Sequence, residues 1–301
     1  MDKWVPLICI IFSAILVLVA YSLWNLNITD ASDNTIKKGL QIKGDSIEDI
    51  FSKHKILLVP GHDLENYGAK FNDLKEEEIN LELSKIIYNL FEKDERFDVF
   101  ITRNENGYTK EFSDYFTNQK EEIDNFIYEN KEKTRDSYRN GEFEPVRVVE
   151  HNLAAKDVAF KLYGINKWVN DNEIDLVVHV HFNDYPRDNM DIAGKYNGFS
   201  IYIPSNNLTG YDGAKKIAKN LRENLGKFFN ESNLPVEKDI IIKNSDLIAV
   251  GSNNTITNSI PILVEYGYIY EDIFYREDQR VGNLNKAAYQ TYDSIRKNLT
   301  N

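Results

Sequence analysis

The sequence alternates between short apolar runs and longer stretches with helical periodicity along most of its length. The apolar runs predict strands at 55–60, 97–103, 175–182, 198–204, 245–251 and 261–267, and the periodic stretches predict helices at 77–93, 110–132, 147–171, 213–232 and 279–298. Short apolar runs bounded by turn residues are typical of buried strands. The alternation predicts an α/β fold with a mostly parallel, twisted sheet and helices on both faces.

Residues 5–24 form an apolar stretch without a charge near the N-terminus. At about 1.5 Å rise per residue, a helix of this length spans roughly 30 Å, the hydrocarbon thickness of a bilayer. Trp4 and Trp24 bracket the stretch in the manner of interfacial anchors. A cleaved signal sequence is the alternative, but its apolar core usually runs about 7–15 residues and ends in a small-residue cleavage site. We therefore favour one N-terminal transmembrane helix within residues 1–24.

The rest of the chain divides into a linker and a folded domain. Residues 25–45 are polar, rich in Asn and Asp, and aperiodic, which is typical of a juxtamembrane linker. From residue 46 to residue 301 the pattern is that of a globular domain. With 42% hydrophobic residues over the chain, wholesale disorder is not expected.

The charge balance and the single cysteine narrow the classes of function. The 48 acidic side chains outnumber the 36 basic ones and give a net charge of -12. That balance argues against a nucleic-acid partner and against broad adhesion to anionic lipid surfaces. The only cysteine, Cys9, lies in the apolar N-terminal stretch, so no intrachain disulfide and no thiolate metal site can form. A metal site here would need His, Asp or Glu.

Polar side chains lie at the ends of three predicted strands. His62 follows the first strand after a Pro-Gly break, His181 ends the third, and Glu265 comes immediately after the apolar residues of the last. Glu76 opens a helix three residues before Ile79 on its buried stripe, so it should face the sheet. Because ligands gather at the carboxyl ends of the strands in open α/β sheets, we expect these side chains to converge.

The chemistry of these four side chains is that of a catalytic zinc site. Two imidazoles and one carboxylate from separate elements form a ligand set that leaves one position open. We predict His62, Glu76 and His181 as zinc ligands. Glu265 is then the general base for an attacking water.

Each residue also has a plainer interpretation. His62 would be a loop residue, Glu76 an acid favoured by the helix dipole, and His181 a core histidine. Glu265 is harder to explain this way, because a carboxylate in a buried strand is costly to desolvate without a partner or a proton.

Two more residues lie near His181 in the sequence. His179 shares a strand face with His181 but lies about 6–7 Å deeper. It is interpreted as a residue that supports the ligands from behind or as a structural histidine. The alternative, that His179 is the ligand and His181 is displaced, stays open. Asn183, just past the strand, is a candidate for the same supporting place.

Four motifs at these residues resemble the zinc-dependent N-acetylmuramoyl-L-alanine amidases of the bacterial cell wall, the amidase_3 type. They are "LLVPGHD", "DLKEEEINLELSKII", "DLVVHVHFND" and "IPILVEYGYI", in the order of the family. Together with "FITR" and "AAYQTYDSI" the resemblance spans residue 56 to about residue 296. It puts the metal ligands at His62, Glu76 and His181 and the catalytic glutamate at Glu265.

The resemblance implies hydrolysis of the amide between the lactyl group of N-acetylmuramic acid and L-alanine of the stem peptide. It implies Zn2+ as the cofactor and peptidoglycan as the substrate. Because that substrate lies outside the cytoplasm, we expect a single-pass protein of the cell membrane, with its catalytic domain on the periplasmic or extracellular face. The expected partners are thus the membrane and peptidoglycan, while a protein activator is left open.

The chain departs from the family pattern at three places. Asp63 stands where the family has a second glycine soon after the histidine, and His179 takes the position of a serine. The connection after Arg103 is longer than in the family and predicts a helical insertion around 104–146. That insertion is either an extra packing helix or a helix that covers or regulates the cleft.

Two other functions remain open at this point. One is a different zinc-dependent amidase or peptidase on the same scaffold. The other is a membrane-tethered cell-wall-binding protein without catalytic activity. Suitable residue types at all four predicted catalytic positions count against the inactive protein.

Overall fold

The computed structural model describes residues 53–141, 154–252 and 255–300. The predicted anchor at 1–24 and linker at 25–45 lie outside these residues. Among the helices in the described ranges, none is both long and apolar enough to cross a membrane. The described residues belong to one unit that begins at Lys53.

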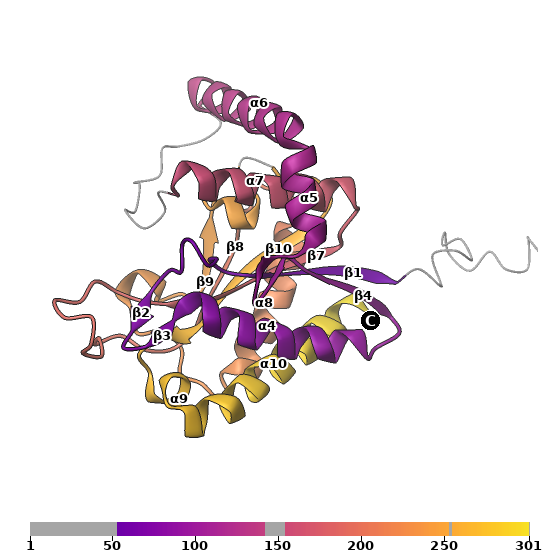
Figure 1. Ribbon diagram of the computed structural model, residues 1–301. Helices are drawn as coiled ribbons and strands as arrows, with labels where there is room; N and C mark the ends of the chain where they lie inside the picture. The colour runs from indigo at the N-terminus through magenta and orange to yellow at the C-terminus, as the bar shows by residue number, and fades with distance from the viewer. Residues whose placement is uncertain (1–52, 142–153, 253–254, 301) are drawn as a thin grey trace, which may run out of the picture. The chain divides into compact units, whose positions relative to one another are not determined.

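A six-stranded sheet forms the centre of this unit (Figure 1). In spatial order its strands are β4 (Phe97–Ile101), β1 (His54–Pro60), β7 (Leu176–Asn183), β10 (Ile260–Tyr268), β8 (Ser200–Pro204) and β9 (Ile241–Asn244). Neighbouring strands run parallel except β10 and β8, which run antiparallel. The predicted α/β class with a mainly parallel sheet is confirmed.

Helices cover both faces of the sheet, as Figure 1 shows with the sheet nearly edge-on. One face packs against α4 (Glu76–Glu92), α8 (Tyr211–Leu225) and α10 (Glu277–Leu299). The other face packs against α5 (Lys110–Asn118) and α7 (Lys156–Asp171). Helix α6 (Lys120–Arg139) lies on α7. The short elements are α9 (Asp272–Tyr275), the 3₁₀ turns η2 (Pro235–Glu237) and η3 (Ile248–Val250), and two small hairpins, β2 (Lys70–Phe71) with β3 (Leu74–Lys75) and β5 (Arg103–Asn104) with β6 (Gly107–Tyr108).

In strand β1 the residues from Ile56 onward are apolar and buried, whereas His54 and Lys55 before them are only partly buried. Ile56 and Leu58 pack with the core on the α4 side, whereas Leu57 and Val59 pack on the α7 side. Successive side chains of a strand point to opposite faces, so a strand covered on both sides needs an apolar residue at every position. This burial holds the end of β1 rigidly at the edge where the polar residues begin.

Helix α4 is held against the sheet by a stripe of apolar side chains. Ile79, Leu83, Ile87 and Phe91 recur every four residues and are fully buried. Such spacing places side chains on one helix face. With that face fixed, the first residue of α4, Glu76, lies at the carboxyl edge of the strands.

The predicted strand at 245–251 is wrong. This stretch forms the turn η3, and the edge strand β9, which the sequence pattern did not reveal, lies just before it. The Asn244 side chain accepts hydrogen bonds from the backbone amides of Asp246 (2.7 Å) and Leu247 (2.9 Å), which turns the chain away from the sheet. Val250 is nevertheless fully buried, so the apolar run packs into the core without pairing as a strand.

Three predicted helices differ in their bounds. The stretch at 110–132 is two helices, α5 and α6, which meet at Gln119. The helix predicted at 213–232 ends at Leu225, where Gly226 follows and lowers helix propensity. Of the helix predicted at 147–171, the described part begins at Lys156. The role predicted for the insertion that contains α5 and α6 stays a prediction.

Candidate metal centre

The carboxyl ends of three adjacent strands bring predicted site residues to one edge of the sheet. His62 lies two residues past Pro60, the last residue of β1, and Pro60 is paired with Val180 of β7. His181 of β7 is paired directly with Glu265 of β10. The parallel register therefore places the two histidines and the glutamate next to one another.

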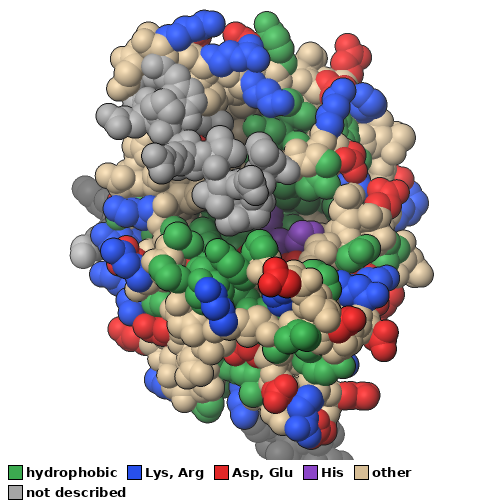
Figure 2. All heavy atoms as spheres, turned by 90° about the vertical axis from the view of Figure 1, so that its left-hand side faces the viewer, with side chains coloured by type: hydrophobic (Ala, Val, Ile, Leu, Met, Phe, Trp, Pro, Cys, Tyr) green, Lys and Arg blue, Asp and Glu red, His purple; other side chains and the backbone are tan. Residues whose placement is uncertain are grey.

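His62, Glu76 and His181 form a compact cluster at this edge. The Nε2 atom of His62 lies 3.1 Å from Oε2 of Glu76, and Nδ1 of His181 lies 3.1 Å from Oε1 of the same carboxylate. The imidazole centroids are 5.2 Å apart. One potential ligand atom from each residue lies within 4.8 Å of the others, so the three could hold a metal ion. Histidine side chains show in a hollow of the surface in Figure 2, beside a group of hydrophobic side chains.

The Glu76 carboxylate is buried and bonded on both oxygens. Its Oε2 accepts a hydrogen bond from the Ala69 amide at 2.9 Å, and its Oε1 accepts one from the Asn80 side chain at 3.3 Å. Asn80 lies one helical turn further along α4, and its amide group also donates to the Gly61 carbonyl at 3.1 Å. The start of α4 and the loop after β1 are thereby joined beneath the cluster.

Two glycines make room for the cluster. A Cβ on Gly61 would lie 2.3 Å from Cε1 of His181. A Cβ on Gly68 would lie 2.5 Å from Oε2 of Glu76, and Gly68 has a φ of +74°, which also favours glycine. His62 itself has a φ of +62°, an uncommon conformation for a residue with a side chain. The backbone is thus shaped to bring these side chains close together.

The two histidines differ in protonation. Burial opposes protonation of His62, but the charge of Glu76 and its hydrogen bond outweigh that effect and raise the pKa of His62. Burial lowers the pKa of His181, and the Glu76 contacts only partly oppose it. Burial would raise the pKa of Glu76, yet the neighbouring histidines hold it far below its ordinary value. An ionised carboxylate thus lies between one easily protonated and one neutral imidazole.

The carboxyl group of Glu265 is buried, and the neighbouring charges that act on it in the described part of the chain are negative. Burial raises the pKa of Glu265 well above its ordinary value, and the negative charges of Glu76 and Glu237 add to the rise. Its Oε2 atom is buried and has no hydrogen-bond partner among the described residues. Such a group is protonated or needs a cation nearby. Imidazole nitrogens and a carboxylate oxygen are ligands that zinc takes, so the donor set of the cluster fits that cation.

The sequence matches the Amidase_3 family, described as N-acetylmuramoyl-L-alanine amidase, over residues 56–297. This chain belongs to that family. The matched residues include the four that the sequence motifs singled out, together with nearly the whole described unit. A comparison with curated proteins found no match.

Solved amidase structures share the fold. The amidase Ami1 from Mycobacterium smegmatis is 12% identical, with a TM-score of 0.54, and the match covers 83% of this chain and 98% of that one. The apo form of Ami1 from Mycobacterium abscessus is 14% identical, with a TM-score of 0.53 and coverage of 82% and 98%. The CwlD amidase from Clostridioides difficile, solved in complex with the GerS lipoprotein, is 18% identical, with a TM-score of 0.52 and coverage of 82% and 99%. At such identities the likeness concerns the fold alone.

His179 and Asn183 lie beside the cluster in different ways. His179 is buried between β1 and β10, and its Nε2 atom has no hydrogen-bond partner among the described residues. Burial, with a smaller effect of the nearby His181, lowers the pKa of His179 to about 3, so the ring is neutral. The Asn183 side chain donates to Oε1 of Glu237 at 3.0 Å. The supporting role predicted for these two residues stays a prediction.

Sequence reasoning missed the part that Arg103 plays beneath the cluster. Its guanidinium is 1% exposed and donates to the carbonyls of Pro60 (3.3 Å), Gly61 (3.0 Å) and Glu77 (2.6 Å). Its Nη1 atom also lies 3.3 Å from the Glu77 carboxylate. The available signal was an arginine at the last position of the predicted strand 97–103, near the edge where the other site residues were expected. Arg103 fixes the backbone from which His62 projects.

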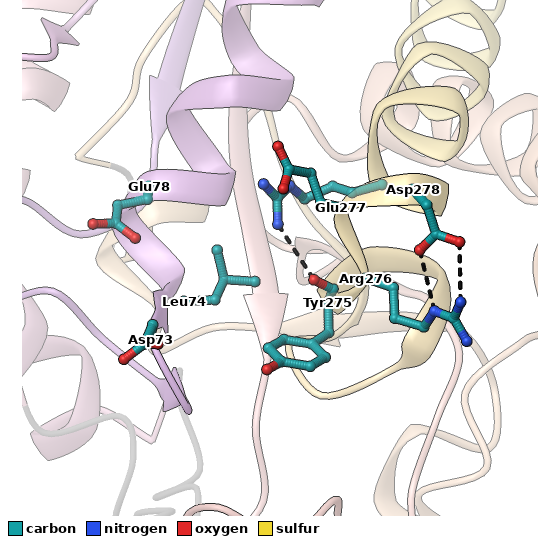
Figure 3. Close-up of a pocket in the computed structure, with 8 residues that line it drawn as sticks. Asp73, Leu74, Glu78, Tyr275, Arg276, Glu277 and Asp278 are labelled. Atoms are coloured by element: carbon teal, nitrogen blue, oxygen red, sulfur yellow. Dashed lines mark hydrogen bonds and ion pairs between the residues drawn. The ribbon is translucent and has the colours of Figure 1, made fainter.

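A separate hollow of about 520 Å³ lies between the start of α4 and the start of α10 (Figure 3). Its walls include Asp73 and Glu78 on one side and Arg276 and Asp278 on the other, and the last two are paired at 3.0 Å. None of its lining residues belongs to the cluster of His62, Glu76 and His181. This hollow does not contribute a residue to the candidate metal centre.

Proposed function

We propose that this amidase is zinc-dependent and hydrolyses the amide between the lactyl group of N-acetylmuramic acid and L-alanine of the stem peptide. Membership of the N-acetylmuramoyl-L-alanine amidase family supports the peptidoglycan amidase activity. The observation that carries zinc dependence is the convergence of His62, Glu76 and His181, with potential ligand atoms within 4.8 Å of one another.

In this proposal His62, Glu76 and His181 hold the zinc ion, and Glu265 acts on protons. When bound, zinc would polarise the amide carbonyl and make a water molecule more acidic. The Glu265 carboxylate takes a proton from the attacking water and passes it to the leaving nitrogen of L-alanine. The amide C–N bond breaks, the lactyl group becomes a carboxylic acid, and L-alanine leaves with a free amino group.

The surroundings of Glu265 suit a group that gains and loses a proton. Its raised pKa favours holding a proton between the two transfers. Its buried Oε2 atom has no partner among the described residues, so no other side chain there competes for that proton. The pairing of Glu265 with His181 across β10 and β7 supports a place for its carboxylate beside the proposed metal ligands.

The proposal extends to the whole chain. Residues 46–301 would be the catalytic domain, with the insertion around 104–146, and residues 1–24 would tether it to the cell membrane through the linker at 25–45. Because peptidoglycan lies outside the cytoplasm, the catalytic domain would face outward. Protease treatment of intact cells or spheroplasts tests this topology: the domain should be degraded from outside without lysis.

Metal content and product analysis test the enzymatic proposal. The full-length protein, purified in detergent, should contain about one zinc per chain and release stem peptides with a free N-terminal L-alanine from muropeptides, as mass spectrometry would show. A zinc content well below one at neutral pH would refute zinc dependence. Cleavage within the stem peptide instead would indicate a zinc peptidase on the same scaffold.

A further inference from the structure

A buried carboxylate directly follows His62 in the loop after β1. Asp63 is 6% exposed and stands where the family resemblance led us to expect a small residue. A buried carboxylate is costly unless its oxygens are bonded. The contacts of Asp63 therefore show what the residue does in this loop.

The two carboxylate oxygens of Asp63 have different partners. Its Oδ1 accepts hydrogen bonds from the backbone amides of Glu65 (3.0 Å) and Asn66 (2.8 Å), which closes the loop into a tight turn. Its Oδ2 accepts from Nζ of Lys161 at 2.8 Å. One oxygen therefore shapes the loop, and the other joins it to helix α7.

Lys161, the partner of Asp63 on α7, has further contacts that hold its side chain in place. Its ammonium also lies 3.1 Å from the Glu65 carboxylate and 5.3 Å from the centre of the Tyr108 ring. The side chain is 20% exposed, so the pair with Asp63 is shielded from water more than a surface pair. Lys161 thus connects α7 to the metal-site loop and to the β5–β6 hairpin.

The backbone of His62 needs such support from both sides. His62 has a φ of +62°, and a residue in this conformation persists only where its surroundings hold it. Arg103 holds the preceding carbonyls of Pro60 and Gly61 from the sheet edge. Lys161 holds the following residue, Asp63, from the α7 side.

We propose that Asp63 and Lys161 are positioning residues that keep the His62 imidazole aimed at the metal and tie the metal centre to helix α7. This inference rests on the proposed zinc-binding function. It also accounts for Asp63 in place of a smaller residue, because a small side chain could not reach the ammonium of Lys161. Residues that orient a metal ligand in this way contribute to metal affinity without touching the metal.

Zinc affinity and a cobalt spectrum test the proposal. In the full-length protein, D63N and K161M should each raise the dissociation constant of zinc about 10- to 100-fold, measured by competition with a chelating dye. The visible absorption bands of the Co2+-loaded protein should shift in both, because the ligand geometry changes. The double variant should bind zinc about as tightly as the weaker-binding single variant, since both substitutions break the same contact. K161R, which keeps the charge, should restore most of the affinity.

Lys167 supplies the matched control on the same helix. Its side chain is 18% exposed and pairs with Asp171 at 2.7 Å, so K167M removes a similar ion pair of α7. We expect K167M to leave the zinc affinity and the cobalt spectrum unchanged. If D63N does not fold, judged by circular dichroism, K161M decides the question alone.

The possible failures are distinguishable. Wild-type affinity and an unchanged cobalt spectrum in the two single variants would overturn this inference alone, even if thermal stability fell, because the pair would then be merely structural. Equal weakening by K167M would overturn it too. A wild-type protein that binds neither zinc nor cobalt would overturn the proposed function and this inference together.

Discussion

The ends of β1 and β10 deliver functional side chains in contrasting ways. His62 projects from a loop, its side chain is 32% exposed, and both its backbone and ring are held by neighbours such as Glu76 and Arg103. Glu265 lies within a buried strand, and its Oε2 atom has no hydrogen-bond partner in the described part of the chain. Neighbouring side chains hold His62 in place, whereas strand pairing is the restraint on Glu265 that the described residues show.

The contrast follows from what each residue is proposed to do. A metal ligand must present one nitrogen in one direction, so a loop that carries it needs additional contacts. A general base must alternate between two protonation states, and a fixed hydrogen-bond donor would stabilise only the ionised one. Substitutions at the two strand ends therefore separate restraint from proton transfer.

The largest effect is expected at Glu265, at the β10 end. Replacing Glu265 by Gln removes the proton acceptor and should lower turnover of muropeptides about 10²- to 10⁴-fold. Zinc content, measured by mass spectrometry of the metal, should stay at the wild-type value because Glu265 is not assigned as a ligand. Glu82→Gln, at an ion pair with Arg280 away from the cluster, is the control and should keep full turnover. Loss of zinc from Glu265→Gln would contradict the division of roles.

At the restrained end, His62→Ala should weaken zinc binding by more than about 100-fold, because a direct ligand contributes more than a supporting residue. His62→Gly offers a comparison that removes the same imidazole. Both should lose zinc alike, but the metal-free glycine variant should be more stable by about 1 kcal/mol, since glycine adopts a positive φ without strain. Equal urea-unfolding midpoints would show that His62 stores no backbone strain.

The close approach of the loop to β7 gives a smaller effect. Gly61→Ala places a methyl group against the His181 ring and should cost about 1–3 kcal/mol of folding free energy, with weaker zinc binding as the ring shifts. Gly282→Ala in α10 is the matched control, because a Cβ there meets nothing within 4 Å. It should be neutral or stabilising in urea unfolding. Similar losses from both substitutions would argue against the packing explanation.

The smallest effect is a pH dependence at the β1 end. The pKa of His62 is raised above 6.5, because the contacts with Glu76 outweigh burial. Zinc needs the neutral imidazole, so its affinity should fall by about tenfold per pH unit once the pH drops below that raised pKa. The metal-free protein should show the opposite trend: stability from this pair is present below 6.5 and is lost as the pH rises through the raised pKa. A zinc affinity that is flat between pH 8 and 6 would exclude this protonation.

Much of the fold followed from local sequence patterns. The apolar runs of β1, β7 and β10 and the four-residue stripe of α4 are visible in the sequence because burial on a strand face or helix face requires them. The edge strand β9 was not predictable, because its four residues are only partly buried and its pairing with β8 depends on partners far along the chain. The apolar run at 245–251 was wrongly predicted as a strand, because a turn that is buried in the core needs apolar residues just as a buried strand does.

The sequence by itself determined the α/β class and which side chains have metal-site chemistry, because periodicity and residue type are local properties. Only the tertiary structure decided how the site is held. The contact between Asp63 and Lys161 joins residues 98 positions apart, and Arg103 reaches the loop carbonyls across 43 and 42 positions. Such partners are chosen by the packing of α7 and β4 against β1, and no local pattern encodes that packing.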